Sequence, residues 1–499
     1  MDAPASSPTT STAAVGAAVE AAAAAASGWA RSRPADRARA LTAVAGALEA
    51  ERERLVAAAD RETRLGTARL HSELTRTTFQ LGLFATEAST GALYDVRIDR
   101  ADPDWPTGPR PELRRYRTAL GPVLVFAAGN FPFAFSVAGG DTASAWAAGC
   151  PVVVKAHPGH PELSRLTAGI VRRVLAGAGV PEGVFALIEG ERAGVEALRH
   201  PALRAAAFTG SERGGLALAR IAADRPEPIP FYGELGSVNP VVVTEAAARA
   251  RTREIAEGCA ASLTQGAGQF CTNPGLLFLP AEDHGLLAAL TAAVGAVPAA
   301  PMLGDRFAAG YLDGARQLAA LPGARRLVWP AEGAPEPAPR LLALDLAAFT
   351  AAGRAATAEC FGPLGLVVTY GNRAELTVVL RKLPGQLTGS LHAEAAEAEA
   401  EAAEAVEAGA DGELAALAEV LGDRSGRVLF NQWPTGVSVT HAMQHGGPFP
   451  AATVPATTSV GTAAAERFLR PVAYQALPEA LLPEPLREAN PWGVPRRVR

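Results

Sequence analysis

The chain has 499 residues, of which 48% are hydrophobic and 19% are charged, and its formal net charge is −5. This length indicates two or three domains, and the negative charge without a basic block argues against a nucleic-acid-binding protein. No uninterrupted apolar run reaches the roughly 18 residues of a membrane span, and the alanine-rich start lacks the basic residues of a signal peptide.

The four cysteines, Cys150, Cys259, Cys271 and Cys360, are far apart in the sequence, and they form no CxxC pair or Cys/His cluster. This usage is typical of a reduced protein without structural zinc. The eight histidines show no metal-ligand spacing either. We therefore expect a cytoplasmic location and no metal site.

Helices are predicted over residues 12–94, because apolar residues recur there at helical spacing. Breaks are expected around Ser32–Pro34 and around Asp60. Residues 95–118 are rich in Pro and Arg and contain short alternating runs. Such a segment is typical of an extended arm or hairpin rather than of a core strand.

Strand-like and helix-like runs then alternate for more than 100 residues. Strands are predicted within 121–130, 151–158, 184–190, 203–211 and 232–243, with helices over 136–149, 161–179 and 212–223 between them. This alternation predicts a parallel, doubly wound sheet. Ligands of such sheets bind at the carboxyl ends of the strands, where Asn130, Lys155 and Ser211 fall.

A second α/β region is expected beyond residue 245. Its first helix should run to about Gln265, where Gly266 and Gly268 interrupt the pattern and lead to Cys271. Such a thiol lies on irregular backbone that a substrate can approach. Apolar strand-like runs follow at 278–280, 325–330 and 361–370.

Two further segments complete the chain. Residues 393–420 are rich in Ala and Glu and are predicted to form one or two solvated surface helices. Residues 467–478 have strand propensity but no evident place in either core. A strand at a chain end often pairs with another subunit, and we expect that here.

Four motifs occur in one order: FAAGNFPF with Asn130, ELGS with Glu234, GQFC with Cys271 and ECFGP with Glu359. Together with FTGS at 208–211, they resemble the NAD(P)-dependent aldehyde dehydrogenase superfamily over about residues 30–480. Within it, the chain is similar to the branch that contains the α-ketoglutaric semialdehyde (2,5-dioxovalerate) dehydrogenases. NADP-linked fatty aldehyde dehydrogenases are similar to the same branch.

The resemblance implies an α/β fold with a Rossmann-type cofactor domain, an α/β catalytic domain and a small oligomerisation arm. The expected ranges are 12–94 and 119–245 for the nucleotide-binding domain, 246–455 for the catalytic domain, and 95–118 and 456–480 for the arm. A homodimer or homotetramer is expected.

Oxidation of an aldehyde by hydride transfer requires a tetrahedral intermediate, and a thiolate is a suitable nucleophile to form it. Our hypothesis is that Cys271 attacks the carbonyl. The resemblance implies that the Asn130 amide and the Cys271 backbone N–H hold the oxyanion. It also makes Glu234 the general base that hydrolyses the thioester, with a pKa raised by a dry site. The other three cysteines are interpreted as structural.

The sequence lacks a G-x-G-x-x-G phosphate loop. Instead, the helix that begins after Ser211 can offer its N-terminal N–H groups to a pyrophosphate. By resemblance, Lys155 would reach the adenosine ribose. Glu359, just before Phe361, would hold the nicotinamide ribose.

Cofactor preference depends on the residues after the second strand. Many NAD-preferring relatives carry Lys-Pro-x-Glu here, whereas this chain has Lys155-Ala-His157-Pro158. No carboxylate therefore opposes a 2′-phosphate at this position. With Lys155, and His157 or Arg192 as further partners, the sequence predicts NADP as cofactor, with NAD also possible.

The substrate is expected to be a small-molecule aldehyde. Suggested lining residues are Phe131, Phe135, Phe270, Trp433, Thr435 and the 457–459 run, which do not distinguish 2,5-dioxovalerate from a medium- or long-chain fatty aldehyde. Overall similarity favours 2,5-dioxovalerate.

Two alternatives from other functional classes stay open. One is a CoA-acylating enzyme, against which Glu234 argues because a hydrolytic base would waste the thioester. The other is a non-catalytic scaffold. A scaffold would tolerate the loss of Cys271, Glu234 or Asn130, and all three are present.

Overall fold

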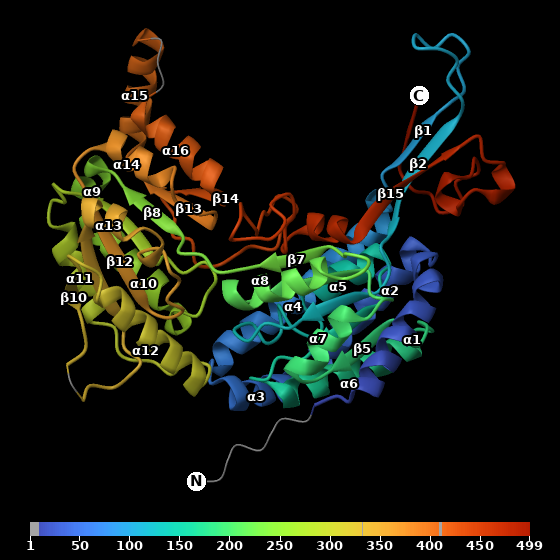
Figure 1. Cartoon of the computed structure of the whole chain (residues 1–499), viewed down its shortest axis with the longest axis horizontal. Coiled ribbons are helices and arrows are strands. Elements are labelled where there is room, and N and C mark those ends of the chain that lie inside the picture. The colour runs from blue at the N-terminus through green and yellow to red at the C-terminus, as the bar shows by residue number, and fades with distance from the viewer. Residues whose placement is uncertain (1–8, 332, 409–411) are drawn as a thin grey trace.

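The computed structural model describes residues 9–331, 333–408 and 412–499. Within them, three sheets organise the chain: one of five strands, one of seven and one of four. Figure 1 shows the seven-stranded lobe and the four-stranded arm on opposite sides of the five-stranded lobe. The mixed α/β architecture with parallel sheets confirms the predicted fold class.

Four helices form the N-terminal region: α1 (Thr12–Ala30), α2 (Pro34–Ala50), α3 (Arg52–Thr63) and α4 (Thr67–Thr90). The predicted break around Ser32–Pro34 is confirmed, whereas the one expected around Asp60 falls a few residues later, between Thr63 and Thr67. Asp60 lies inside α3, and its carboxylate accepts a hydrogen bond of 2.9 Å from the Gly66 backbone N–H. The chain turns at Arg64 and Gly66, which both have positive φ.

Helix α1 is long and apolar enough, by length and composition alone, to cross a membrane. The prediction from uninterrupted apolar runs did not register it, because Glu20 interrupts the run. In the structure, Val15, Val19 and Ala22 of α1 are buried in a hydrophobic cluster against one face of the five-stranded sheet.

The five-stranded sheet is parallel throughout, which confirms the predicted doubly wound arrangement. Its order is β5 (Phe185–Ile188), β4 (Val152–Lys155), β3 (Val123–Phe126), β6 (Ala205–Thr209) and β7 (Phe231–Glu234). The crossover helices are α5 (Gly140–Ala148), α6 (Pro161–Gly177), α7 (Glu191–Arg199) and α8 (Glu212–Ala223).

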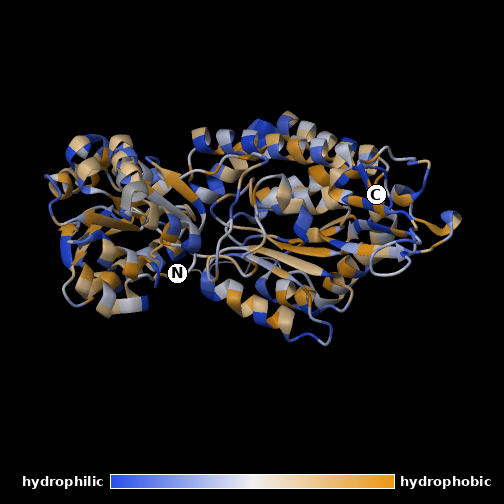
Figure 2. Cartoon of the chain, turned by 90° about the horizontal axis from the view of Figure 1, so that it is seen from above, coloured by the Kyte–Doolittle hydropathy of each residue, from blue (hydrophilic) through white to orange (hydrophobic). Residues whose placement is uncertain are grey.

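Strand β3 shows how both faces of this sheet are covered. Val123 and Val125 pack with α2, α4, α5 and α6, whereas Leu124 and Phe126 pack on the opposite face with α1, α7 and α8. A strand buried on both faces is apolar without alternation. In Figure 2 the strands of this lobe are accordingly mostly hydrophobic, and the outer helices carry the hydrophilic residues.

The seven-stranded sheet begins earlier than predicted. Its order is β10 (Arg325–Val328), β11 (Arg340–Asp345), β12 (Leu364–Tyr370), β9 (Leu276–Pro280), β8 (Pro240–Val243), β13 (Gln386–His392) and β14 (Ser425–Phe430). Because β8 pairs with β9 and β13, the chain passes between the lobes at residues 235–239, ahead of the expected boundary at 245.

Helices cover both faces of this sheet. They are α9 (Glu245–Ala250), α10 (Thr252–Thr264), α11 (Leu286–Gly295), α12 (Asp305–Ala319), α13 (Leu346–Ala352), α14 (Arg373–Leu380), α15 (Ala395–Ala408) and α16 (Glu413–Arg424). The prediction of merely solvated helices over 393–420 is wrong for α16, which buries Leu414, Leu417, Val420 and Leu421. Residues 409–411 of that prediction lie outside the described residues.

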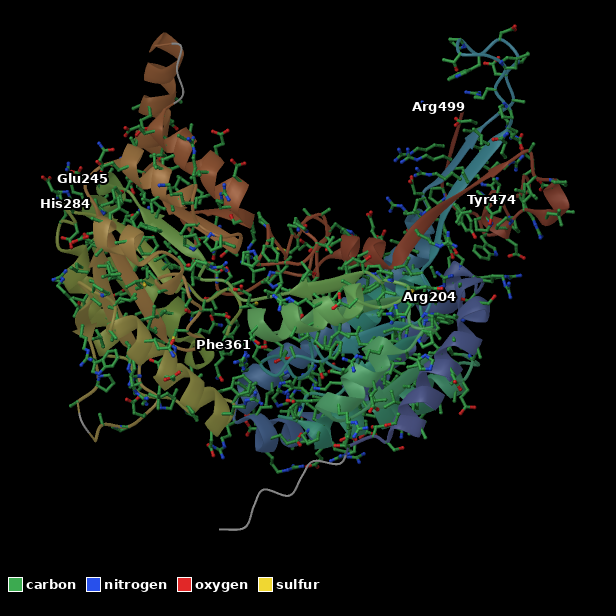
Figure 3. All side chains as sticks on the ribbon, viewed as in Figure 1. Arg204, Glu245, His284, Phe361, Tyr474 and Arg499 are labelled. Atoms are coloured by element: carbon green, nitrogen blue, oxygen red, sulfur yellow. The ribbon has the colours of Figure 1, made fainter. Side chains whose placement is uncertain are left out.

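The arm is a four-stranded sheet in the order β15 (Leu469–Gln475), β2 (Leu113–Ala119), β1 (Val96–Asp99) and β16 (Arg496–Val498). The predicted hairpin at 95–118 is confirmed by the antiparallel pairing of β1 with β2. The C-terminal strand was expected to pair with another subunit. Instead, β15 pairs antiparallel with β2 of its own chain. Figure 3 shows Tyr474 of β15 and Arg499 on this arm.

Between β14 and β15 the chain returns across the five-stranded lobe as a mostly irregular segment, residues 431–468, here called the returning segment. It covers the outer edge of β7: Leu235 N donates to Ala451 O at 2.8 Å, and Thr453 N donates to Gly233 O at 3.0 Å. The edge strand that ends in Glu234 is therefore held from both sides.

Candidate active site

Cys271 is presented by a left-handed turn. Helix α10 ends at Thr264, and the next three residues with positive φ are Gly266, Ala267 and Gly268. A Cβ on Gly268 would lie 2.3 Å from the carbonyl carbon of Gly362, so the close approach requires glycine. The turn leaves Cys271 partly exposed, whereas Cys259 inside α10 is buried.

The backbone around Cys271 is anchored by a buried amide. Nδ2 of Asn239 donates hydrogen bonds of 2.8 Å to the carbonyls of both Cys271 and Asn273. Its Oδ1 accepts a bond of 2.9 Å from the Thr388 hydroxyl. Asn239 lies in the crossing between the two sheets, so it couples the position of the thiol to the junction of the lobes.

The returning segment brings a histidine to the thiol and the predicted base. His445 Nε2 lies 3.4 Å from Cys271 Sγ and 3.0 Å from Glu234 Oε1. The Ser459 hydroxyl donates to the other carboxylate oxygen, Glu234 Oε2. His445, Glu234 and Ser459 are all buried. Cys271 and Glu234, which are 37 positions apart by their numbers, thus meet as predicted, together with a histidine that the prediction lacked.

The electrostatics differ from the expectation for Glu234. Burial alone would raise its pKa, but the charge and close approach of His445 and the hydrogen bond from Ser459 outweigh burial, so the pKa of Glu234 is lowered. Burial, followed by the charges of Glu234 and Glu359, raises the pKa of Cys271 well above its usual value, and Arg76 offsets this in part. The resting thiol is therefore protonated at neutral pH.

Asn130 lies beside the same turn. Its side-chain Nδ2 donates to the Gln269 carbonyl at 3.1 Å, two residues before Cys271. Because an amide has two N–H donors, this bond occupies one of them. The backbone carbonyl of Asn130 accepts a hydrogen bond of 2.6 Å from Arg69 Nη2.

A cavity of about 440 Å³ opens in front of the thiol. Its walls combine aromatic and charged side chains, and they include three of the five predicted lining residues. The lining consists of Leu65, Arg69, Ser72, Glu73, Arg76, Phe131, Phe135, Gln265, Gly266, Phe270, Cys271, Thr272, Gly436, Val437 and His445.

The other predicted lining residues are placed elsewhere. Trp433 packs against Gly258 of α10 and against the ring of His392, and the Thr435 hydroxyl pairs with that of Ser262 at 2.7 Å. The 457–459 run acts behind the site, where Ser459 bonds to Glu234. Aromatic and hydroxyl side chains suit both the cavity wall and the packed interior behind it. Residue type alone therefore could not show which of these residues line the cavity.

Helix α4 contributes three charged residues to the cavity wall. Glu73 Oε1 accepts bonds from the backbone N–H groups of Phe133 and Ala134, at 2.8 and 3.0 Å. Arg69 lies over the rings of Phe131 and Phe270, and Arg76 lies over those of Phe131 and Phe135. Arg69 Nη1 and Arg76 Nε and Nη2 are buried and have no hydrogen-bond partner in the described part of the chain.

The predicted nicotinamide-ribose residues lie where the lobes meet. Figure 3 places Phe361 between the five-stranded and seven-stranded lobes. Its ring packs against that of Phe307 of α12, with the two ring centroids 6.2 Å apart. The Glu359 carboxylate approaches Gly236 so closely that a Cβ there would lie 2.3 Å from Oε2. The surrounding protein raises the pKa of Glu359 to about 7, although the side chain is accessible to solvent.

Two predicted cofactor residues lie at strand ends of the five-stranded sheet. Lys155 ends β4 and is buried against Gly194 of α7, and burial lowers the pKa of its ammonium group. Ser211 caps α8, and its hydroxyl accepts a bond from the Gly214 N–H at 3.3 Å. The first turn of α8 thus offers N–H groups to an anion, which fits a dinucleotide phosphate.

His157 and Arg192 do not supply the expected positive charge. The His157 ring packs between His160 and Phe307, and burial lowers its pKa well below the usual value, so it is neutral at pH 7. Arg192 is 80% exposed and is paired with Glu196 at 2.7 Å on α7. Of the predicted set, Lys155 is the cation at this end of the sheet.

Among the other cysteines, Cys150 and Cys259 are fully buried and Cys360 lies partly buried against Gly314. Burial raises their pKa values to about 11 for Cys150 and about 12 for Cys259 and Cys360. None of the three lines the cavity in front of Cys271. Their positions agree with the structural role expected for them.

The comparison with known proteins identifies the family. A family model described as the aldehyde dehydrogenase family matches residues 3–310. An α-ketoglutaric semialdehyde dehydrogenase 2 of Azospirillum brasilense is 45% identical over 478 residues, covering 93% of this chain and 87% of the relative. The chain belongs to the aldehyde dehydrogenase family.

A second relative agrees with this assignment, and a solved structure shares the fold. An α-ketoglutaric semialdehyde dehydrogenase of Acinetobacter baylyi is 42% identical, covering 88% of this chain and 82% of the relative. A solved 1-pyrroline-5-carboxylate dehydrogenase from Thermus with bound NAD superposes with a TM-score of 0.76 at 21% identity, over 93% of this chain and 86% of that chain. This aldehyde dehydrogenase is therefore an oxidoreductase that acts on aldehydes with NAD(P).

Sequence reasoning missed His445, Arg69 and Arg76 of this aldehyde dehydrogenase. The two arginines are seven positions apart on α4, which places them on one face of the helix. That spacing was a usable signal once the helix was predicted. His445 gave none, because it comes from an irregular segment 174 residues after Cys271.

Proposed function

We propose that the enzyme oxidises 2,5-dioxovalerate (α-ketoglutaric semialdehyde) to 2-oxoglutarate, with NADP as the preferred acceptor. The substrate assignment rests on a pair of arginines, Arg69 and Arg76, in the wall of the cavity that also contains Cys271. A buried guanidinium with unpaired N–H groups is costly unless an anion satisfies it. The carboxylate at the far end of an ω-oxo acid is such an anion. The names of the two curated relatives support the same substrate.

The residues suggest an order of steps. The Cys271 thiol gives its proton to the His445–Glu234 pair and attacks the aldehyde carbon. The oxyanion accepts hydrogen bonds from the free N–H of the Asn130 amide and from the Cys271 backbone N–H. When bound, the nicotinamide cofactor supplies the hydride acceptor. Once the His445–Glu234 pair has released the thiol proton to solvent, Glu234 takes a proton from the water that hydrolyses the thioester, and the departing Cys271 thiolate is reprotonated.

The preference for NADP rests on Lys155 and on the absence of a carboxylate at Pro158. Ser211 with the first turn of α8 would hold the phosphates, and Glu359 the ribose next to the nicotinamide. Comparing kcat/KM for NADP and NAD tests this preference. A hundredfold advantage for NAD would contradict it.

The substrate is tested by comparing 2,5-dioxovalerate with pentanal, an uncharged aldehyde of equal chain length, in the wild type and in Arg76→Leu. We expect Arg76→Leu to lower kcat/KM for 2,5-dioxovalerate by about 10- to 100-fold, the value of one or two charge-assisted hydrogen bonds. The value for pentanal should change far less. An equal loss of kcat/KM with both aldehydes would show that Arg76 supports the structure of the site and does not bind the substrate carboxylate.

The alternative substrate, a medium- or long-chain fatty aldehyde, is disfavoured by the same wall. An alkyl chain would leave the buried N–H groups of Arg69 and Arg76 unpaired. Decanal turned over with a higher kcat/KM than 2,5-dioxovalerate would favour the fatty aldehyde instead.

We also propose that the enzyme is a cytoplasmic homodimer or homotetramer. Strand β14 supports assembly, because it is an edge strand of the seven-stranded sheet and exposes Val428 and Phe430. Exposed edges with apolar side chains favour pairing with another chain.

A further inference from the structure

Three side-chain atoms of metal-ligating type converge at the thiol. Cys271 Sγ, His445 Nε2 and a carboxylate oxygen of Glu234 all lie within 4.8 Å of one another. The separation is 3.4 Å between Sγ and Nε2, and 3.0 Å between Nε2 and Glu234 Oε1. Thiolate, imidazole and carboxylate are the ligands that Zn²⁺ uses in proteins.

These separations are close to those around a tetrahedral zinc ion. With Zn–S of about 2.3 Å and Zn–N and Zn–O of about 2.0–2.2 Å, ligand atoms are about 3.4–3.6 Å apart at tetrahedral angles. The Sγ–Nε2 and Nε2–Oε1 separations therefore need to open by only a few tenths of an ångström to match, and the sulfur and the carboxylate oxygen lie within 4.8 Å of each other.

The carboxylate is prepared for such a role. Glu234 Oε2 is held by the Ser459 hydroxyl, whereas the buried Oε1 lies 3.0 Å from His445 Nε2 and accepts no hydrogen bond of normal geometry from the described residues. One oxygen is thus oriented by a neighbouring hydroxyl, while the other faces the histidine nitrogen with which it would share the ion. This is the second-shell arrangement found around metal-binding carboxylates.

The fourth coordination position faces the cavity. Cys271 and His445 both line it, so an ion bound to the triad can reach the site from the substrate side and keep a water molecule as its fourth ligand. Three protein ligands with one open position characterise accessible zinc sites rather than closed structural ones.

We propose that Cys271, His445 and Glu234 form a reversible inhibitory site for Zn²⁺. Bound there, the ion holds the sulfur as thiolate and engages the carboxylate, so neither group is available to an aldehyde. The second nitrogen of His445, Nδ1, is buried without a partner in the described part of the chain. The site thus lacks one stabilising bond that permanent zinc sites have, which is why binding is reversible.

The test uses the full-length enzyme without substrate or cofactor, so it does not depend on the identity of the aldehyde. Co²⁺, a spectroscopic substitute for Zn²⁺, is titrated into the protein. We expect one equivalent to produce a thiolate-to-cobalt charge-transfer band in the near ultraviolet, which Zn²⁺ then displaces. His445→Gln should weaken Co²⁺ binding at least about tenfold, and Cys271→Ser should abolish the band.

Two matched controls identify the triad as the site. Cys360→Ser removes another partly buried thiol, and His441→Gln removes an exposed histidine of the same returning segment; both should retain the band. Zn²⁺ should also inhibit the wild type reversibly, with activity recovered on addition of EDTA.

Three results would overturn the proposal: no thiolate band in the wild type, a band that persists in Cys271→Ser, or Co²⁺ affinity unchanged in His445→Gln. If His445→Gln fails to fold by circular dichroism, Cys271→Ser decides alone, because it changes one atom of a partly exposed side chain.

Discussion

The thiol of Cys271 has to lose its proton before it can attack, because burial and nearby carboxylates raise its pKa. Two acceptors are close: His445 Nε2 at 3.4 Å, and the Glu234 carboxylate paired with His445. A thiol with a raised pKa is a strong nucleophile once it is ionised. His445 and Glu234 therefore allow Cys271 to lose its proton as it attacks, and the resting enzyme does not hold Cys271 as a thiolate.

Removing the histidine should change the pH dependence of activity. His445 lowers the pKa of Glu234, so in His445→Gln burial dominates and that pKa rises. Glu234 must be ionised to act as a base. The acid limb of the kcat–pH profile should therefore move to higher pH, with kcat reduced about 100-fold.

Steady-state kinetics from pH 5 to 9 measures this shift, and the exposed His441→Gln variant is the matched control. An acid limb that stays in place in His445→Gln would show that the histidine does not influence Glu234.

Cofactor binding should strengthen as the pH rises through about 7. Desolvation by the surrounding protein raises the pKa of Glu359 to about 7, and only the ionised carboxylate can accept hydrogen bonds from ribose hydroxyls with both oxygens. Below pH 7 the Kd for NADP should increase by up to about tenfold per pH unit, and above pH 8 it should level off.

Fluorescence titration of NADP at several pH values tests this, with Glu359→Gln as the control that should bind with little pH dependence. An equally steep dependence in Glu359→Gln would assign the titration to another group.

The same side chains show where sequence reasoning ended. Asn130, Glu234 and Cys271 could be placed together, because strand ends and motif order limit where they lie. The contributions of His445 and of Arg69 and Arg76 depend on how the returning segment and α4 pack. A buried arginine on a helix has the same local pattern as a solvated one.

Among the elements, the left-handed turn before Cys271 was also predicted only in part. Glycines at 266 and 268 indicated an interruption of the helix, and the structure confirms it. The left-handed conformation of Ala267 between them could not be predicted, since alanine rarely adopts it. Tertiary contacts, such as the packing of Gly268 on Gly362, impose it.

Substituting Gly268 should damage both stability and catalysis. Gly268→Ala places a Cβ within 2.3 Å of backbone, at a φ of +67°. We expect a loss of at least about 1–2 kcal/mol in the free energy of unfolding from the conformational strain alone, and a lower kcat because Cys271 moves.

Urea denaturation followed by circular dichroism measures the loss. Gly310→Ala in α12 is the matched control, because a Cβ there meets nothing within 4 Å and should stabilise the helix by about 0.5–1 kcal/mol. Equal effects of the two substitutions would contradict the role given to the turn.

For the whole molecule, alternating strands and helices predicted the doubly wound lobe well, because local periodicity determines those elements. The connection between the lobes was misplaced by a few residues. Strand β8 is as apolar as the strands of the first sheet, and only its pairing with β9 and β13 shows which sheet it joins. Long-range pairing of this kind leaves no local trace.

Assembly can be tested at the free edge of β14. Phe430 is 47% exposed there, and Phe430→Glu should convert the proposed dimer or tetramer into smaller species by placing a charge in an apolar contact. Sedimentation velocity measures the change. Val378→Glu on α14, an exposed apolar position of similar accessibility, is the control, and an unchanged sedimentation coefficient in Phe430→Glu would exclude this edge from the interface.

The returning segment has a consequence for biosynthesis. A ribosome makes Glu234 and Cys271 before the returning segment, because His445 follows the cysteine by 174 residues and Ser459 comes later still. A nascent chain therefore carries the Cys271 thiol through those 174 residues without His445 and Ser459. Catalytic competence requires the returning segment, so a chain cut short before His445 would have the nucleophile but lack the two side chains that contact Cys271 and Glu234.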